Sequence, residues 1–338
     1  MLSKFRIELN KDWSDFCHQV EQNSQPEYCL LCGKKMTSPC NSHVVPQFIL
    51  KRIAEKGMVC YGQSLFRNAR NNDFAKTTTG INNAFTFRLI CKDCDKLRFC
   101  HYEKPEAILN YDELNREEQK QILSEMAIKT HLSHIYTKAK TYTRNAMLYP
   151  EQMEILHACG KQTAYELDIP EHMTYIQTLT RFQKLTSFPF VVLYDCLFNY
   201  ETDIAAQTII AYTHNLKGDQ LFDPLDFSHI ELMRYCYLMV LPYQGKTRIL
   251  FYVEKKFQSR VQSIIDDFNS LSEKEKLHFL FVSLVIYDEQ FYISPSLQEK
   301  MTKDRKIVKL YTKTDNSGSS GKNEIANFRK YHNYLMKN

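Results

Sequence analysis

Two pairs of cysteines have the spacing of metal ligands. Cys29 and Cys32 form one Cys-x-x-Cys pair, and Cys91 and Cys94 form a second pair much further along the chain. Each pair can place two thiolates on one ion, and a structural zinc ion needs four ligands in a tetrahedron. The sequence therefore predicts one zinc site built from all four residues. The alternative is that one pair is buried as small apolar side chains.

A histidine lies between the two pairs, in the stretch Ser-His-Val-Val-Pro at positions 42–46. The two valines favour an extended chain, and Pro46 suits the first turn of a helix. We therefore expect His43 on a short strand or loop just before a helix. A neutral imidazole is a competent general base near pH 7. The alternative role of His43 is structural, with its ring hydrogen-bonded to the backbone of the first cysteine turn.

The apolar pattern predicts the elements that must position these residues. Residues 85–89 alternate between apolar and polar side chains, which predicts a strand leading into Cys91. The segment 92–102 predicts a helix that carries Asp95. The long segment between the cysteine pairs is then an excursion closed at its base by the metal, so that metal binding contributes to folding.

The excursion contains basic residues interleaved with aromatic ones, namely Arg67, Arg70 and Lys76. Such a loop could follow a phosphate backbone, and a solvated loop is the alternative. The net charge of +5 over 338 residues is compatible with a nucleic-acid partner without requiring one.

This order of motifs resembles the HNH, or His-Me finger (ββα-metal), nuclease fold in its zinc-stapled form. It is most similar to a group of bacterial proteins with Ser-His-(Ile/Val)-(Ile/Val)-Pro-x-Phe near the N-terminus, and the likeness covers residues 26–105. In that fold a histidine acts as general base on a phosphodiester, and a divalent cation stabilises the developing charge. The resemblance implies His43 as the base and Asp95 as a ligand of Mg²⁺ or Mn²⁺. The candidates for the asparagine of the family name are Asn82 and Asn83, of which we take Asn83, and Glu103 could be a further ligand.

Two positions depart from the family pattern. Ser42 stands directly before the histidine, where active members carry Asp, Glu or His, and Phe99 stands where a second helix-borne ligand is expected. His101 and Glu103 are close in sequence and could substitute for the missing ligand.

Two candidate functions follow from these residues and from the resemblance. One is a metal-dependent endonuclease that cleaves nucleic-acid phosphodiesters, with DNA favoured over RNA as the partner, and with defence against phage or mobile DNA as a family-level association. The other is a non-catalytic, zinc-stabilised scaffold that binds nucleic acid or protein.

The composition is that of an ordinary globular protein, with 43% hydrophobic and 25% charged residues. Eleven cysteines, two of them in each close pair, fit metal binding in a reducing cytosol better than a set of disulfides. No secretory signal and no apolar run long enough to span a membrane is visible. We therefore expect a cytoplasmic protein without a membrane partner.

The fold class predicted from these patterns is α+β. The parts expected along the chain are an N-terminal packing arm made of a short strand and a helical turn, a zinc-bound module, a helical region, an antiparallel sheet packed with helices, and a basic flexible tail. Their ranges are 1–25, 26–105, 106–186, 187–300 and 301–338.

Three local signals are sharper. A helix is expected from near Asn115 towards residue 140, carrying His131 and His134 as surface or packing residues. Two β-branched and aromatic runs around Gly245 predict a hairpin. Ser272 and the glutamate three residues later predict a helix-capping box.

Overall fold

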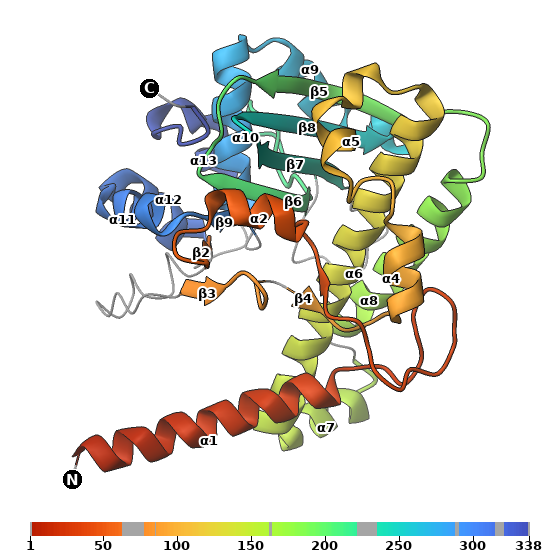
Figure 1. Cartoon of the computed structure of the whole chain (residues 1–338). Helices are drawn as coiled ribbons and strands as arrows, with labels where there is room; N and C mark the ends of the chain where they lie inside the picture. Colours follow the sequence, from red (N-terminus) through yellow and green to blue (C-terminus); the bar gives the residue numbers. More distant parts are fainter. Residues whose placement is uncertain are drawn as a thin grey trace.

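The computed structural model describes residues 2–62, 78–84, 86–161, 164–221, 235–287, 291–314 and 321–336. These residues form one seven-stranded antiparallel sheet and a separate two-stranded pair, with helices on both faces of the sheet (Figure 1). The predicted α+β fold is confirmed.

The strand order in the large sheet is β3-β2-β9-β6-β7-β8-β5. The strands in chain order are β2 (Met58–Tyr61), β3 (Thr78–Gly80), β5 (Phe190–Phe198), β6 (Ile204–Ile210), β7 (Cys236–Tyr243), β8 (Lys246–Glu254) and β9 (Tyr292–Ile293). The predicted hairpin is β7–β8, and its turn residues Gln244 and Gly245 both have positive φ, of 49° and 79°. Two consecutive residues with positive φ match the right-handed twist of the flanking strands.

Side chains of β7 alternate between two apolar cores, because successive residues of a strand point to opposite faces. Tyr237 and Met239 belong to the core under α6 (Arg116–Leu148) and α8 (Ala164–Phe182). Leu238 and Val240 belong to the core on the other face. That face is covered by α9 (Gln262–Asn269), α10 (Glu273–Tyr287), α11 (Pro295–Lys303), α12 (Arg305–Thr314) and α13 (Gly321–Ala326).

The sheet joins parts of the chain that lie far apart in sequence. β2 and β3 come from the excursion between the cysteine pairs, and β2 pairs with β9, where Cys60 lies opposite Ile293. Residues from 26–105 and from 187–300 therefore share one sheet. The short helix α2 (Gln47–Ile53), directly after the histidine motif, lies over β6 and β7 (Figure 1).

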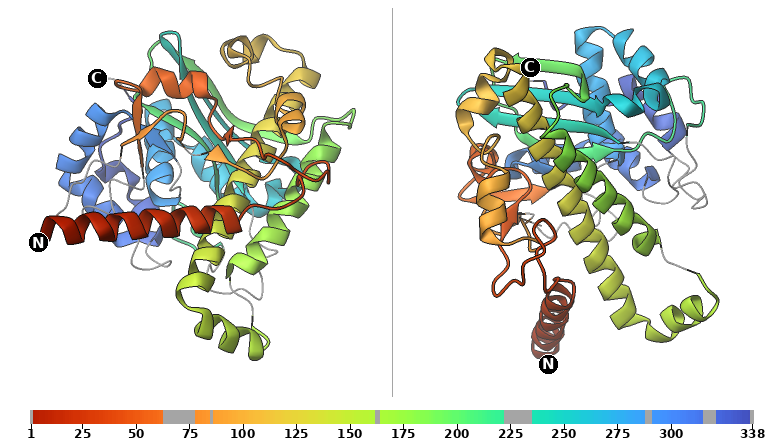
Figure 2. Two further views of the ribbon diagram at one scale, coloured as in Figure 1. Left: turned by 60° about the horizontal axis from the view of Figure 1, so that its bottom comes forward. Right: turned by 90° about the vertical axis from the view of Figure 1, so that its right-hand side faces the viewer.

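The N-terminal arm differs from its prediction. We expected a strand and a helical turn, but α1 (Leu2–Asn23) is one helix that projects away from the sheet (Figures 1 and 2). The apolar residues Leu9, Trp13, Phe16 and Val20 recur at intervals of three or four, which suits one helix face, and the alternation before them misled the prediction. In the last turn of α1, Val20 is buried.

Two other segments also differ from expectation. Helix α6 continues past residue 140 to Leu148, because no glycine or proline interrupts it before Pro150, and it begins with a full capping box between Asn115 and Glu118. The tail is largely packed where the structure describes it. Its buried apolar residues are Met301, Ile307, Leu310, Ile325, Phe328 and Leu335. The linker at 315–320 lies outside the described residues.

The remaining elements are β1 (Ser42–His43), β4 (Thr86–Phe87), α4 (Lys92–Arg98), α5 (Pro105–Leu109), η1 (Tyr111–Glu113), α7 (Pro150–Ala158), η3 (Lys255–Val261) and η4 (Phe328–Lys330). The capping box predicted at Ser272 is present at the start of α10. Over the described ranges, none of the helices combines the length and the apolar character that crossing a bilayer requires.

Candidate metal centre and active site

The four cysteines of the predicted zinc site come together. Their sulfur atoms all lie within 4.8 Å of one another, so they could hold a metal ion, as the sequence predicts. Cys29 and Cys32 lie on a tight turn, in which the N–H of Gly33 donates to the carbonyl of Cys29 at 2.8 Å and Gly33 has a φ of 69°. Glycine tolerates this left-handed conformation without steric cost. Cys91 is the N-cap of α4, and Cys94 lies in its first turn.

Few other bonds hold this turn against α4. The N–H of Leu30 donates to the carbonyl of Leu89 at 3.1 Å, and the N–H of Cys91 donates to the sulfur of Cys29 at 3.4 Å. Burial raises the pKa of the Cys94 thiol, and the other three cysteines raise it further. Four thiolates would repel one another in this space, so a divalent cation would be the group that holds them together.

Strands β1 and β4 pair beside the cluster, although α2, β2 and β3 lie between them in the chain. Ser42 of β1 lies opposite Phe87 of β4, and His43 lies opposite Thr86. Helix α4 follows β4 directly and carries Asp95. The cysteine cluster sits at the start of this helix and so fixes its position relative to the strands.

His43 is half-buried and uses one ring nitrogen. Its Nε2–H donates to the carbonyl oxygen of Ile81 at 2.9 Å, which leaves the lone pair on Nδ1. No side chain or backbone group in the described part of the chain hydrogen-bonds Nδ1. Burial lowers the pKa of His43, Lys129 lowers it further, and Asp95 acts in the opposite direction. The imidazole is therefore neutral near pH 7, and Ile81 rather than the cysteine turn anchors it.

Asp95 is held by two side-chain donors from the segment before His43. The hydroxyl of Ser42 donates to Oδ1 at 2.5 Å, and the thiol of Cys40 donates to Oδ2 at 3.3 Å. Burial and the charge of Asp95 raise the pKa of Cys40 to about 12, so Cys40 remains a thiol donor. Ser42, at the position where the family carries a metal ligand, thus orients the carboxylate of Asp95.

A lysine ammonium lies between the two carboxylates that the resemblance assigns to a divalent cation. The side chain of Lys129, on α6, is 1% exposed, and its Nζ contacts the carboxylate of Glu103 and lies 3.5 Å from Oδ1 of Asp95. The same Nζ lies 4.7 Å from the ring centre of Phe99 and 5.6 Å from that of Tyr102. Carboxylates and ring faces both favour a cation at this place.

The sequence did not point to Lys129. It stands in the middle of a long helix, well after Asp95 in the chain, and no local pattern links the two. The structure buries α6 on all sides around Lys129, and a lysine is rarely fully buried unless it is paired.

The other site residues predicted from the sequence are not shown in contact with His43. Asn83 is exposed; its N–H donates to the carbonyl of Gly80 at 2.9 Å, and its carbonyl accepts from Tyr61 at 3.5 Å. Neither contact joins it to His43, so its catalytic role stays a prediction. Arg67, Arg70 and Lys76 lie outside the described residues, and their role in nucleic-acid binding stays a prediction too.

The histidines of α6 are packing residues. His131 is fully buried; its Nδ1 lies 2.8 Å from Nδ1 of His172, and its Nε2 lies 3.0 Å from the hydroxyl of Tyr237. Burial lowers the pKa of His131 and His172 well below the ordinary value, and that of His134 to about 3, so all three stay neutral.

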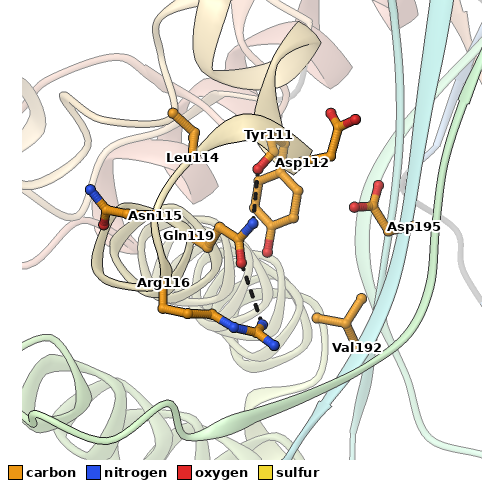
Figure 3. Close-up of a pocket in the computed structure, with 8 residues that line it drawn as sticks. All are labelled: Tyr111, Asp112, Leu114, Asn115, Arg116, Gln119, Val192 and Asp195. Atoms are coloured by element: carbon orange, nitrogen blue, oxygen red, sulfur yellow. Dashed lines mark hydrogen bonds between the residues drawn. The ribbon is translucent and has the colours of Figure 1, made fainter.

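A cavity of about 470 Å³ lies elsewhere, between the start of α6 and β5 (Figure 3). Its lining residues are Tyr111, Asp112, Leu114, Asn115, Arg116, Gln119, Val192 and Asp195. Arg116 donates to Gln119 at 3.4 Å and stacks on Phe188, with its guanidinium carbon 4.6 Å from the ring centre. None of the site residues predicted from the sequence lines this cavity.

In comparisons with known proteins, no protein-family model, no curated protein and no solved structure matches this chain. We therefore infer its function from the residues and their geometry.

Proposed function

We propose that residues 26–105 form a zinc-closed module of the HNH type, and that the chain is an endonuclease that hydrolyses DNA phosphodiesters. The observation that carries the proposal is the set of contacts around the imidazole of His43. Its Nε2–H is anchored on Ile81, its Nδ1 lone pair has no described partner, and the charge of Asp95 acts on its ring. A positioned, neutral imidazole with one available nitrogen has the properties of a general base.

In the proposed reaction, Nδ1 of His43 removes a proton from the water that attacks phosphorus. The carbonyl of Ile81 keeps the ring oriented and holds the proton on Nε2. Asp95 and Glu103 would hold Mg²⁺ or Mn²⁺, which stabilises the charge that develops on the phosphoryl oxygens. Hard carboxylate oxygens suit these ions. The Lys129 ammonium now pairs with both carboxylates, so it would have to move aside for a divalent cation to bind there.

The other assignments complete the proposal. The four cysteines would hold zinc, which is the ion most often bound by four thiolates in a closed structural site. Asn83 would face the scissile strand from the segment that also contains Ile81. Arg67, Arg70 and Lys76 would contact the phosphate backbone.

The wild-type chain provides the direct test of this function. With Mg²⁺ or Mn²⁺ it is expected to nick or cut double-stranded DNA, and chelation of these ions should stop the reaction while the more tightly held cysteine-bound ion stays in place. Single-stranded DNA and RNA serve as competing substrates. A chain that is inert on all of them with either metal would contradict the proposal.

Replacing Lys129 tests whether the space between Asp95 and Glu103 is a cation site. Lys129→Met leaves two carboxylates without a cation, and removing one partner of a buried ion pair costs about 3–5 kcal/mol. Because the carboxylates are 21% and 35% exposed, we expect a loss of about 2 kcal/mol. Added Mg²⁺ should then raise the melting temperature of Lys129→Met more than that of wild type, as followed by differential scanning fluorimetry.

The matched control is Lys138→Met on the same helix, which removes the partner of Asp168 at 2.5 Å. This variant leaves Asp95, Glu103 and Lys129 unchanged, and Mg²⁺ should not stabilise it beyond wild type. An equal response of the two variants would mean that Asp95 and Glu103 do not form a cation site.

A second candidate function is favoured by the same lysine. With Lys129 between the carboxylates and Ser42 bonded to Asp95, the module could be a non-catalytic, zinc-stabilised scaffold that binds nucleic acid or protein. Under this alternative the wild-type chain binds DNA without cleaving it, and His43→Ala leaves the binding unchanged.

A further inference from the structure

A second group of metal-ligand side chains lies where the chain after α4 meets α6. Sγ of Cys100, Nδ1 of His101 and a carboxylate oxygen of Glu125 all lie within 4.8 Å of one another. Cys100 and His101 are exposed, whereas the side chain of Glu125 is 1% exposed. The cluster therefore has a buried floor and a side that an ion from solvent can reach.

The carboxylate of Glu125 is oriented before any ion arrives. Its Oε2 accepts from the backbone N–H of His101 at 3.0 Å and from that of Tyr102 at 3.1 Å. The other oxygen, Oε1, contacts Nδ1 of His101. A ligating carboxylate whose second oxygen is fixed by hydrogen bonds is the usual outer-shell arrangement of protein metal sites.

The charge balance at Glu125 also indicates a cation. Among the described residues, its one ion-pair partner is His101, because Lys129, one turn further along α6, is engaged by Glu103 and Asp95. A buried carboxylate is costly without a full compensating charge. The thiol of Cys100 donates to the carbonyl of Leu97 at 3.5 Å and lies 3.7 Å from Nδ1 of His101, so its sulfur is held beside the imidazole and the carboxylate.

We propose that Cys100, His101 and Glu125 form a second metal site, which binds Zn²⁺ through Sγ, Nδ1 and Oε1. A mixture of thiolate, imidazole and carboxylate suits a borderline ion such as Zn²⁺ and does not suit Mg²⁺. Binding releases the thiol proton to solvent and moves the imidazole proton from Nδ1 to Nε2. Three protein ligands leave a fourth position for water, in contrast to the closed four-cysteine site. This site is independent of the proposed nuclease activity.

The number of ions bound by the full chain tests the proposal. Zinc-free protein titrated with Co²⁺, which reports thiolate ligands by its absorption, should bind two ions per chain. His101→Ala and Cys100→Ser should each bind one ion and keep the intense absorption of the four-thiolate site. The affinity of the lost site should fall at least 100-fold. Both replaced side chains are exposed, so these variants are expected to fold.

The matched control is Cys159→Ser, which removes another exposed cysteine, at the end of α7. It should bind two ions, like wild type. A wild-type chain that binds one ion, or a His101→Ala variant that still binds two with unchanged affinity, would overturn the proposal.

Discussion

Replacing Cys91 by serine is expected to remove the metal ion of the four-cysteine site and to lower the melting temperature by about 5–10 °C. Cys91 supplies one of the four sulfur atoms, occupies the N-cap position of α4, and donates its N–H to the sulfur of Cys29. Serine suits an N-cap position but lacks the thiolate, and a three-ligand remainder binds zinc far less tightly. Metal content by mass spectrometry and the melting temperature by calorimetry are the measurements.

The size of the drop in melting temperature depends on how many other contacts hold the cysteine turn in place. Residues 26–41 contain no helix or strand of the sheet, and backbone bonds such as Leu30 to Leu89 and Cys40 to Ile90 are few. The binding free energy of a structural ion is folding free energy, which we take as several kcal/mol for this site. Strong chelation of wild type should reproduce the loss.

The control for Cys91→Ser is Cys17→Ser, at an exposed position of α1. It should keep the metal content and the melting temperature of wild type. If Cys91→Ser also kept both, the four cysteines would not form one metal site.

Local signals in the sequence predicted much of the fold. The hairpin around Gly245 and the capping box at Ser272 depend on adjacent residues, and both are present. The four cysteines could be paired because few other residue types make a metal site at that spacing. These features need no knowledge of distant partners.

The parts that could not be predicted depend on contacts between distant segments. Strand β2 pairs with β9, so that Cys60 lies opposite Ile293, and neither short sequence identifies the other as its partner. Lys129 and Glu125 meet the α4 segment because α6 packs beside it, so the cluster with His101 was missed. The sequence suggests His101 as a substitute ligand for the nuclease ion, whereas the structure shows it as the partner of the buried Glu125.

His43→Ala is expected to lower the rate of DNA cleavage by about 10²–10⁴-fold, the usual contribution of a general base. The substitution removes the nitrogen that accepts the proton of the attacking water. It also removes one hydrogen bond, to Ile81, which costs about 1 kcal/mol of stability. Zinc content should not change, because His43 is not a ligand of the cysteine cluster. Single-turnover cleavage of a labelled DNA duplex measures the effect.

The pH dependence and chemical rescue separate a catalytic role from a structural one. Burial lowers the pKa of His43, so the protonated form, which would be inactive, becomes dominant at a lower pH than for an exposed histidine. The acid limb of the wild-type pH–rate profile should therefore lie at lower pH than for an exposed histidine, and it should be absent from the residual activity of His43→Ala. Added imidazole should restore part of the lost rate.

The control is His18→Ala, at an exposed position of α1, which should cleave like wild type. Undiminished cleavage by His43→Ala would assign His43 a structural role and leave the scaffold function as the better explanation of the module.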